Sequence, residues 1–203
     1  MARWSLSHPQ IVYRSGDTLV DDYRQSYWWL RDNTPVDARV LSWWDYGYQL
    51  AGLANRTTIA DGNTWNNDHL ALLGLSLTAP LHEGHTIMRH LADYVLVWSN
   101  DLDKSTHMAK IGNSAFHGHC PSKECKTYGV DRNRAATPMM EQGLMWKLVG
   151  RDENNQDFKQ LFSLVFVSKN RLVRIFKINN VDKHSKKWVS NPKNRQCDAP
   201  GSW

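Results

Sequence analysis

The feature that most constrains the fold is the apolar segment Tyr94-Val95-Leu96-Val97-Trp98, near the middle of this 203-residue chain. A strand that is apolar at almost every position is buried on both faces, as in parallel sheets covered by helices. Shorter β-type segments at 38–43 and 57–60 precede it, and segments with helical spacing of apolar residues lie between them. The pattern predicts an α/β fold, with mixed helices around a small, largely parallel sheet.

The rest of the chain supplies the helices and a second β-rich part. Apolar residues at helical spacing, together with capping residues, predict helices at 21–31, 46–54, 68–77, 80–91, 101–116 and 137–148. Two later apolar segments, 161–167 and 172–178, predict a β-hairpin. We expect an α/β core over residues 1–150 and, packed on it, the hairpin and an irregular basic tail over residues 151–203.

Charge and cysteine content leave several classes of protein open. The net charge is +5, and residues 169–195 contain nine Lys or Arg and one acid. Such a tract can bind nucleic acid or anionic lipid, or it can be a solvated surface. Cys120 and Cys125 are close enough in sequence to form a small disulfide loop in an oxidising compartment. Cys197 would then have no free cysteine of this chain to pair with. No segment approaches the roughly 20 apolar residues that a membrane-spanning helix requires.

Two tryptophans and a carboxylate follow the first β-type segment. Trp43, Trp44 and Asp45 are adjacent, in a chain that has ten tryptophans. Neighbouring residues on a strand point to opposite faces, so both indoles reach one point only if the strand ends here. An indole N–H only donates a hydrogen bond and an ionised carboxylate only accepts one, whereas an alcohol does both. Two indoles and one carboxylate can therefore bind a hydroxyl group and reject an analogue that lacks it.

The same three residues also have a simpler interpretation. Aromatic pairs commonly pack in a core, and Asp45 can cap the helix expected at 46–54. Spacing alone does not decide between the two interpretations.

The residues around this cluster resemble a known family. The run Ser42-Trp43-Trp44-Asp45-Tyr46-Gly47-Tyr48-Gln49 resembles the signature of the oligosaccharyltransferase catalytic subunit, the enzyme that N-glycosylates asparagine. The flanking segments 21–35 and 55–69 are similar to those of eukaryotic members. The segment Asp101 to Met108 fits a second family motif, Asp-x-x-Lys-x-x-x-Met, whose three defined residues share one helix face. Without the resemblance, that spacing would indicate a surface ion pair and a core methionine.

The resemblance assigns roles to individual residues. It implies a pocket for the Ser or Thr side chain two residues after the acceptor asparagine, formed by Trp43, Trp44, Asp45 and Met108. It implies supporting roles for the remaining motif residues, which are Tyr46, Gly47, Asp101 and Lys104.

The resemblance also implies where the chemistry takes place. In the family, the catalytic groups, the divalent metal (Mn²⁺ or Mg²⁺) and the lipid-linked oligosaccharide belong to a multi-pass membrane part of the same subunit. We therefore expect no catalytic residue, cofactor or metal site in this chain. The chain would act on the lumenal face of the endoplasmic reticulum, on acceptor polypeptides that contain Asn-x-Ser/Thr. It would lie next to that membrane part and, in a multi-subunit enzyme, next to other oligosaccharyltransferase subunits.

That compartment bears on the cysteines. A disulfide between Cys120 and Cys125 fits it better than a zinc site made from these cysteines with His117 and His119, because the spacing matches no standard zinc pattern.

Two interpretations from other classes remain. A stand-alone Trp-rich carbohydrate-binding module could stack sugars on Trp28, Trp29 or Trp65. A basic single-strand nucleic-acid binder could use residues 169–195 with Trp188. Neither explains two separate motifs at the family spacing, so we expect no nucleic acid among the partners.

Overall fold

The structure is a computed structural model that describes residues 11–132, 135–152 and 154–191. The strands are β1 (Tyr13–Ser15), β2 (Thr18–Val20), β3 (Arg39–Leu41), β4 (Thr57–Thr58), β5 (Tyr94–Trp98), β6 (Phe162–Val167) and β7 (Val173–Ile178). The longer helices are α2 (Asp22–Asn33), α4 (Asn67–Thr78), α5 (Leu81–Leu91), α6 (Asp101–Ala115) and α10 (Lys183–Ser190). The shorter helical segments are η1 (Trp44–Tyr46), α3 (Gly47–Gln49), η2 (Leu50–Ala54), α7 (Pro138–Gln142), α8 (Leu144–Leu148) and α9 (Gln156–Leu161).

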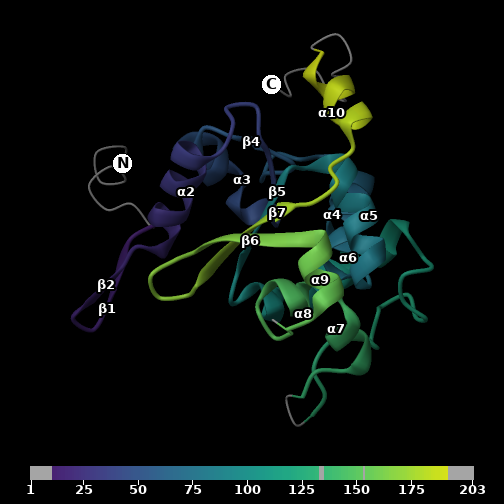
Figure 1. Cartoon of the computed structure of the whole chain (residues 1–203). Coiled ribbons are helices and arrows are strands. Elements are labelled where there is room, and N and C mark those ends of the chain that lie inside the picture. Colours follow the sequence, from purple (N-terminus) through teal and green to yellow (C-terminus); the bar gives the residue numbers. More distant parts are fainter. Residues whose placement is uncertain (1–10, 133–134, 153, 192–203) are drawn as a thin grey trace.

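Within the described residues, the main sheet has five strands in the order β4-β3-β5-β7-β6 (Figure 1). β3 pairs in parallel with β4 and β5, whereas β7 pairs antiparallel with β5 and β6. β5 is therefore the central strand, and its residues 95–98 are buried. The predicted α/β class is confirmed, and the predicted hairpin is the β6–β7 pair, which extends the same sheet.

Helices cover both faces of the sheet. Figure 1 shows the strands between α2, at the left, and the group α4, α5 and α6, at the right. α2 lies against β6 and β7, α5 against β3 and β7, and α6 against β5. Two glycines bring α4 and α6 close together, because a Cβ on Gly74 would lie only 2.4 Å from the carbonyl oxygen of Met108 and one on Gly112 only 2.8 Å from Leu75 N. This contact fixes α6, which follows β5, against the rest of the core.

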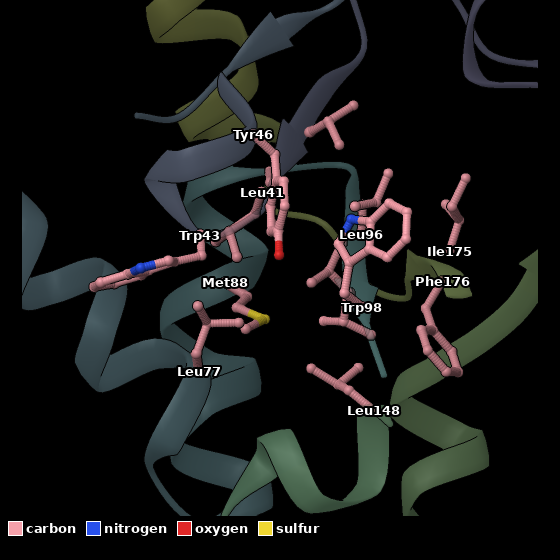
Figure 2. Packing of buried hydrophobic residues seen from close by; sticks show 14 of the residues in the cluster. Leu41, Trp43, Tyr46, Leu77, Met88, Leu96, Trp98, Leu148, Ile175 and Phe176 are labelled. Carbon is pink, nitrogen blue, oxygen red and sulfur yellow. The ribbon is translucent and has the colours of Figure 1, made fainter. Parts of the chain in front are cut away.

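The hydrophobic core extends from the sheet into the segment after β3. Figure 2 shows side chains from the sheet and the surrounding helices in one cluster: Leu41, Leu77, Met88, Leu96, Leu148, Ile175 and Phe176. Trp43, Tyr46 and Trp98 belong to the same cluster. Since these three follow or end β3 and β5, the core reaches the carboxyl edge of the parallel strands.

The basic segment after the hairpin contains a helix. Residues 183–190 form α10, so the expectation of an irregular tail was wrong for this segment. The side chain of Asp182 caps α10 by accepting a hydrogen bond from the His184 N–H at 2.9 Å. Lys186 Nζ donates to the buried carboxylate of Asp93 at 3.2 Å. These polar contacts order the helix although none of its residues is buried. Residues 192–203 of the expected tail lie outside the described residues.

Three other segments differ from the predicted pattern. The helix expected at 137–148 is divided into α7 and α8, because Gly143 is extended and pairs with Pro80 in an isolated bridge. α9 forms in a polar connection, where the Asn155 side chain caps its first turn. The β1–β2 hairpin, whose turn contains Gly16 at φ 59°, precedes α2.

Candidate functional site

The site lies where two neighbouring parallel strands end. β3 ends at Leu41 and leads through Ser42 and Trp43 into the continuous helical segment of η1, α3 and η2. β5 ends at Trp98 and leads into α6, which begins at Asp101. Open α/β sheets build ligand sites at this edge, where the chain leaves the carboxyl ends of the strands. The two sequence motifs therefore meet at one end of the sheet.

The adjacent tryptophans differ in exposure. Trp43 is 5% exposed and packs in the core, whereas Trp44 is 37% exposed. Their ring centroids are 6.2 Å apart. The Trp43 indole N–H makes no hydrogen bond to a described residue, yet it keeps contact with solvent. The two rings are neighbours, but only the Trp44 ring has a substantial exposed fraction.

Asp45 is held at one oxygen and open at the other. It lies inside η1 and caps no helix, which removes the simpler of the two interpretations of this residue. Its side chain is 30% exposed, and Oδ2 accepts a hydrogen bond from Lys104 Nζ at 2.7 Å. Oδ1 accepts no hydrogen bond from the described residues. The carboxylate is thus fixed in position and still able to accept a hydrogen bond from a ligand.

A hydrogen-bonded network joins the two motifs. Lys104 Nζ also donates to the Tyr46 hydroxyl at 3.1 Å and lies 3.9 Å from Asp101 Oδ1. The Tyr46 hydroxyl donates to Asp101 Oδ1 at 2.7 Å, and the Trp98 N–H donates to Asp101 Oδ2 at 2.8 Å. Lys104 therefore links the exposed carboxylate of Asp45 to the buried one of Asp101.

Burial shifts the acid–base properties of this network. Desolvation raises the pKa of Asp101 to about 6, although the hydrogen bonds from Trp98 and Tyr46 and the charge of Lys104 oppose the rise. Desolvation, and then the carboxylate of Asp101, raise the pKa of the Tyr46 hydroxyl well above its usual range. At neutral pH, Tyr46 is thus a hydrogen-bond donor to an ionised Asp101.

Met108 is separated from the surface. It lies on the same face of α6 as Asp101 and Lys104, but it is fully buried in the core. The structure therefore brings Asp45, Tyr46, Asp101 and Lys104 into one network and places Met108 in the core, without exposed surface.

Gly47 lies where two backbone segments approach each other too closely for a side chain. Its φ of −56° is open to any residue, so conformation does not require glycine. A Cβ at this position would lie 2.2 Å from the carbonyl oxygen of Ala60 and 2.5 Å from Cβ of Asp61. The motif is thus packed directly against the loop that follows β4.

Arg56 stabilises the helical ends beside the site. Its guanidinium donates to Thr34 Oγ1 and to the carbonyl oxygens of Arg31, Thr34, Ala54 and Asn55. These oxygens lie at the carboxyl ends of α2 and η2, where carbonyl groups lack intrahelical partners and carry partial negative charge. A buried arginine therefore ties the helical segment that contains the motif to α2.

A disulfide joins Cys120 and Cys125, so neither supplies a thiolate to a metal. Residues 11–132, 135–152 and 154–191 contain no group of three or more His, Cys, Asp or Glu that could hold a metal ion. Within the same residues, no helix is long and apolar enough to cross a membrane. Cys197 lies outside them.

Sequence reasoning missed several aromatic residues around the site. Tyr23 of α2 stacks on Trp98, whose ring centroid lies 5.9 Å from that of Tyr46. Tyr48 is exposed on the same helical segment as Asp45. The helix expected at 21–31 contains Tyr23, but only long-range packing determines which rings it meets.

The chain is similar in sequence to curated proteins. The family model described as the STT3/PglB/AglB core domain matches residues 36–185. The STT3B subunit of dolichyl-diphosphooligosaccharide–protein glycosyltransferase from Oryza sativa subsp. japonica is 35% identical over 212 residues, which cover 85% of this chain and 29% of the relative. The stt-3 subunit of the corresponding glycosyltransferase from Caenorhabditis elegans is 54% identical over 119 residues. That match covers 52% of this chain and 16% of the relative. The chain thus spans less than a third of the length of these relatives.

A solved structure shares the fold. The crystal structure of the C-terminal globular domain of oligosaccharyltransferase from Archaeoglobus fulgidus matches with a TM-score of 0.56 at 16% identity. The match covers 80% of this chain and 99% of that one. The mixed α/β architecture around the site is therefore the fold of a known domain.

Proposed function

The chain belongs to the STT3/PglB/AglB core-domain family, and on this basis we propose that it is the acceptor-reading domain of an oligosaccharyltransferase catalytic subunit. In this proposal, the domain binds the Ser or Thr of an Asn-x-Ser/Thr sequence on the lumenal face of the endoplasmic reticulum. The rest of the subunit transfers an oligosaccharide from a lipid carrier to the asparagine.

The observation that carries the proposal is the state of the Asp45 carboxylate. Lys104 holds Oδ2 at 2.7 Å, and Oδ1 accepts no hydrogen bond from the described residues on a side chain that is 30% exposed. Trp43 and Trp44 immediately precede Asp45 in the chain. A hydroxyl group can donate to Oδ1 and accept from an indole N–H, so one alcohol satisfies both kinds of partner. A side chain without the hydroxyl would leave these groups unpaired on binding, which is costly in a desolvated site.

The network behind Asp45 supports the same role. Lys104 neutralises its charge and fixes its orientation, and the buried pair of Tyr46 and Asp101 fixes Lys104 in turn. Met108 is fully buried, and it would touch a bound side chain only if the site opened further. The carboxylate is thus held in place before the peptide arrives, which lowers the entropic cost of binding.

The proposal divides the work between two parts of the subunit. This chain would hold the acceptor sequence and so position the asparagine amide, which is a proximity contribution to catalysis. The divalent metal, the lipid-linked oligosaccharide and the catalytic carboxylates would belong to the membrane part, and the chain alone should transfer no glycan. Robust transfer to an Asn-x-Thr peptide by the 203 residues alone would contradict this division.

Glycan transfer by the full-length subunit tests the pocket. Wild type should glycosylate an Asn-x-Thr peptide about 100-fold or more faster than an Asn-x-Ala peptide. Asp45→Ala should lose most of the activity on Asn-x-Thr, whereas Asp103→Ala, which removes an exposed acid of α6, should retain it. Full activity of Asp45→Ala on Asn-x-Thr would show that the pocket assignment is wrong.

The two readings from other classes have less support in the structure. Of the three tryptophans considered for a carbohydrate-binding module, Trp29 stacks on Phe166, Trp28 contacts Arg24 and Arg31, and only Trp65, at 84% exposed, offers a widely accessible ring. A single-strand nucleic-acid binder would leave the Asp45 network without a purpose. Binding of free glycans or oligonucleotides by the chain, with no effect of Asp45→Ala on transfer, would favour one of these classes instead.

A further inference from the structure

Tyr48 lies beside the open carboxylate of Asp45. The residues from Trp44 to Ala54 form one continuous helical segment, so Tyr48 follows Asp45 by three positions and Trp44 by four. Residues at these spacings share a helix face, with Cβ atoms about 5–6 Å apart. Tyr48 therefore projects from the same side of the segment as the groups proposed to bind the acceptor hydroxyl.

The two tyrosines of this segment have opposite environments. Tyr46 is 4% exposed and engages Asp101, whereas Tyr48 is 53% exposed, and its hydroxyl makes no hydrogen bond to a described residue. The core and the Lys104 network thus account for Tyr46, whereas Tyr48 belongs to neither of them. A large exposed aromatic ring next to a binding site is a feature of recognition surfaces.

The ring of Tyr48 is nevertheless held in place. A Cβ on Gly62 would lie 3.1 Å from Tyr48 Cε2, so the ring rests against the backbone of the loop after β4 at a position that has no side chain. A ring that is already ordered loses little conformational entropy when a ligand packs on it. Tyr48 is thus an exposed and pre-positioned contact surface.

We propose that Tyr48 is a specificity-determining contact for the acceptor polypeptide, and that it binds an apolar or aromatic side chain within the two residues that follow the hydroxyl residue. This inference rests on the proposed function of Asp45. An extended chain advances about 3.3–3.6 Å per residue, so those two residues lie about 3–7 Å beyond the hydroxyl residue. That distance is comparable to the roughly 5–6 Å between Cβ atoms three positions apart on a helix, which is the spacing of Asp45 and Tyr48.

Peptide kinetics with the full-length subunit test this proposal. The peptides carry Asn-x-Thr followed by two residues, with Phe or Ala at each of those positions. Wild type should show a KM about 3- to 10-fold lower for the better Phe peptide, with kcat nearly unchanged, because the contact is equal in the ground state and the transition state. Tyr48→Ala should abolish this preference, and Tyr48→Phe should keep it.

Three controls separate the possible outcomes. Tyr48→Leu keeps apolar bulk against Gly62 and should lower the preference even if Tyr48→Ala folds poorly. Trp188→Ala removes an exposed ring from α10, whose Lys186 contacts Asp93 at the opposite end of β5, and should change nothing. A preference that survives in both Tyr48→Ala and Tyr48→Leu would overturn the inference, as would a rise in KM for the lipid-linked donor in place of the peptide.

The same assay distinguishes this failure from failure of the proposed function. Each variant is also given an Asn-x-Val peptide, which lacks the hydroxyl. If wild type transfers glycan to Asn-x-Val as well as to Asn-x-Thr, hydroxyl reading is wrong and the Tyr48 inference falls with it. If wild type and Tyr48→Ala both reject Asn-x-Val but also share the same Phe preference, only the role of Tyr48 is wrong.

Discussion

Replacing Gly47 with alanine should destabilise the fold through a steric clash at the motif. The new Cβ would lie 2.2 Å from the Ala60 carbonyl oxygen, about 1.2 Å short of an ordinary 3.4 Å contact, and the obstructing atom is backbone. Overpacking of this kind costs about 1–3 kcal/mol. Alanine recovers up to about 1 kcal/mol because it is the better helix former. With the full gain subtracted, the net loss in the free energy of unfolding should be up to about 2 kcal/mol.

Gly52 supplies a matched control on the same helical segment. A Cβ there meets no atom within 4 Å, so Gly52→Ala gains helix propensity without a clash. Urea unfolding followed by tryptophan fluorescence should place the midpoint of Gly47→Ala below wild type and that of Gly52→Ala at or above it. The difference between the two variants isolates the steric term, about 1–3 kcal/mol. Equal midpoints for the two variants would refute the close-approach argument for Gly47.

Three further changes test the supports of the site. Arg56→Ala should lower the free energy of unfolding by about 2–4 kcal/mol, since five hydrogen bonds to buried or partly buried acceptors are lost, and Arg56→Lys should recover only part of it. Burial raises the pKa of Asp101 from 3.8 to about 6, so the native state binds this proton more tightly than the unfolded state. The contribution of Asp101 to the free energy of unfolding is complete below pH 4 and should fall by on the order of 3 kcal/mol as pH rises through 6. Urea unfolding at several pH values should show this pH dependence in wild type and not in Asp101→Asn. Reduction of the Cys120–Cys125 disulfide should cost about 2 kcal/mol, the loop-closure entropy of a six-residue loop, and thermal melting of the double serine variant should be insensitive to reductant.

The sequence predicted the elements of the fold better than their pairing. The apolar run 94–98 coincides with β5, and the helix expected at 101–116 is α6 to within one residue. Local patterns carry this information, because burial on both faces leaves no polar position in a strand. The insertion of β7 beside β5 could not be predicted in this way, since strand order depends on contacts between distant segments.

Breaks and short elements were harder to predict for specific reasons. Gly143 divides one expected helix because it pairs with Pro80, a residue 63 positions away in the chain. α10 forms in a sequence with few apolar residues, and its order depends on Asp182 and on the contact of Lys186 with Asp93. The β1–β2 hairpin had a local signal, Gly16 followed by Asp17 between β-type residues, which the helical pattern after it obscured.

The residues of the candidate site could be predicted, but the depth at which each side chain lies could not. The resemblance to the family motifs singled out Asp45, Tyr46, Asp101 and Lys104, which the structure joins by hydrogen bonds. The resemblance placed Met108 in the pocket, whereas the spacing taken alone indicated a core methionine, and Met108 is fully buried in the core. The reason for Gly47 and the exposure of Tyr48 likewise depend on the loop after β4, which packs against the motif only in the folded chain.

The most direct test of the central claim is a crossed comparison of acceptor and enzyme. The full-length subunit, as wild type and as Asp45→Asn, is assayed for kcat/KM on Asn-x-Thr and on Asn-x-Val, in which a methyl group replaces the hydroxyl. If Asp45 reads the hydroxyl, the preference of wild type for Thr should fall at least about tenfold in the variant, a coupling of about 1.4 kcal/mol or more. If both enzymes prefer Thr by the same factor, Asp45 does not contact the hydroxyl and the account is wrong.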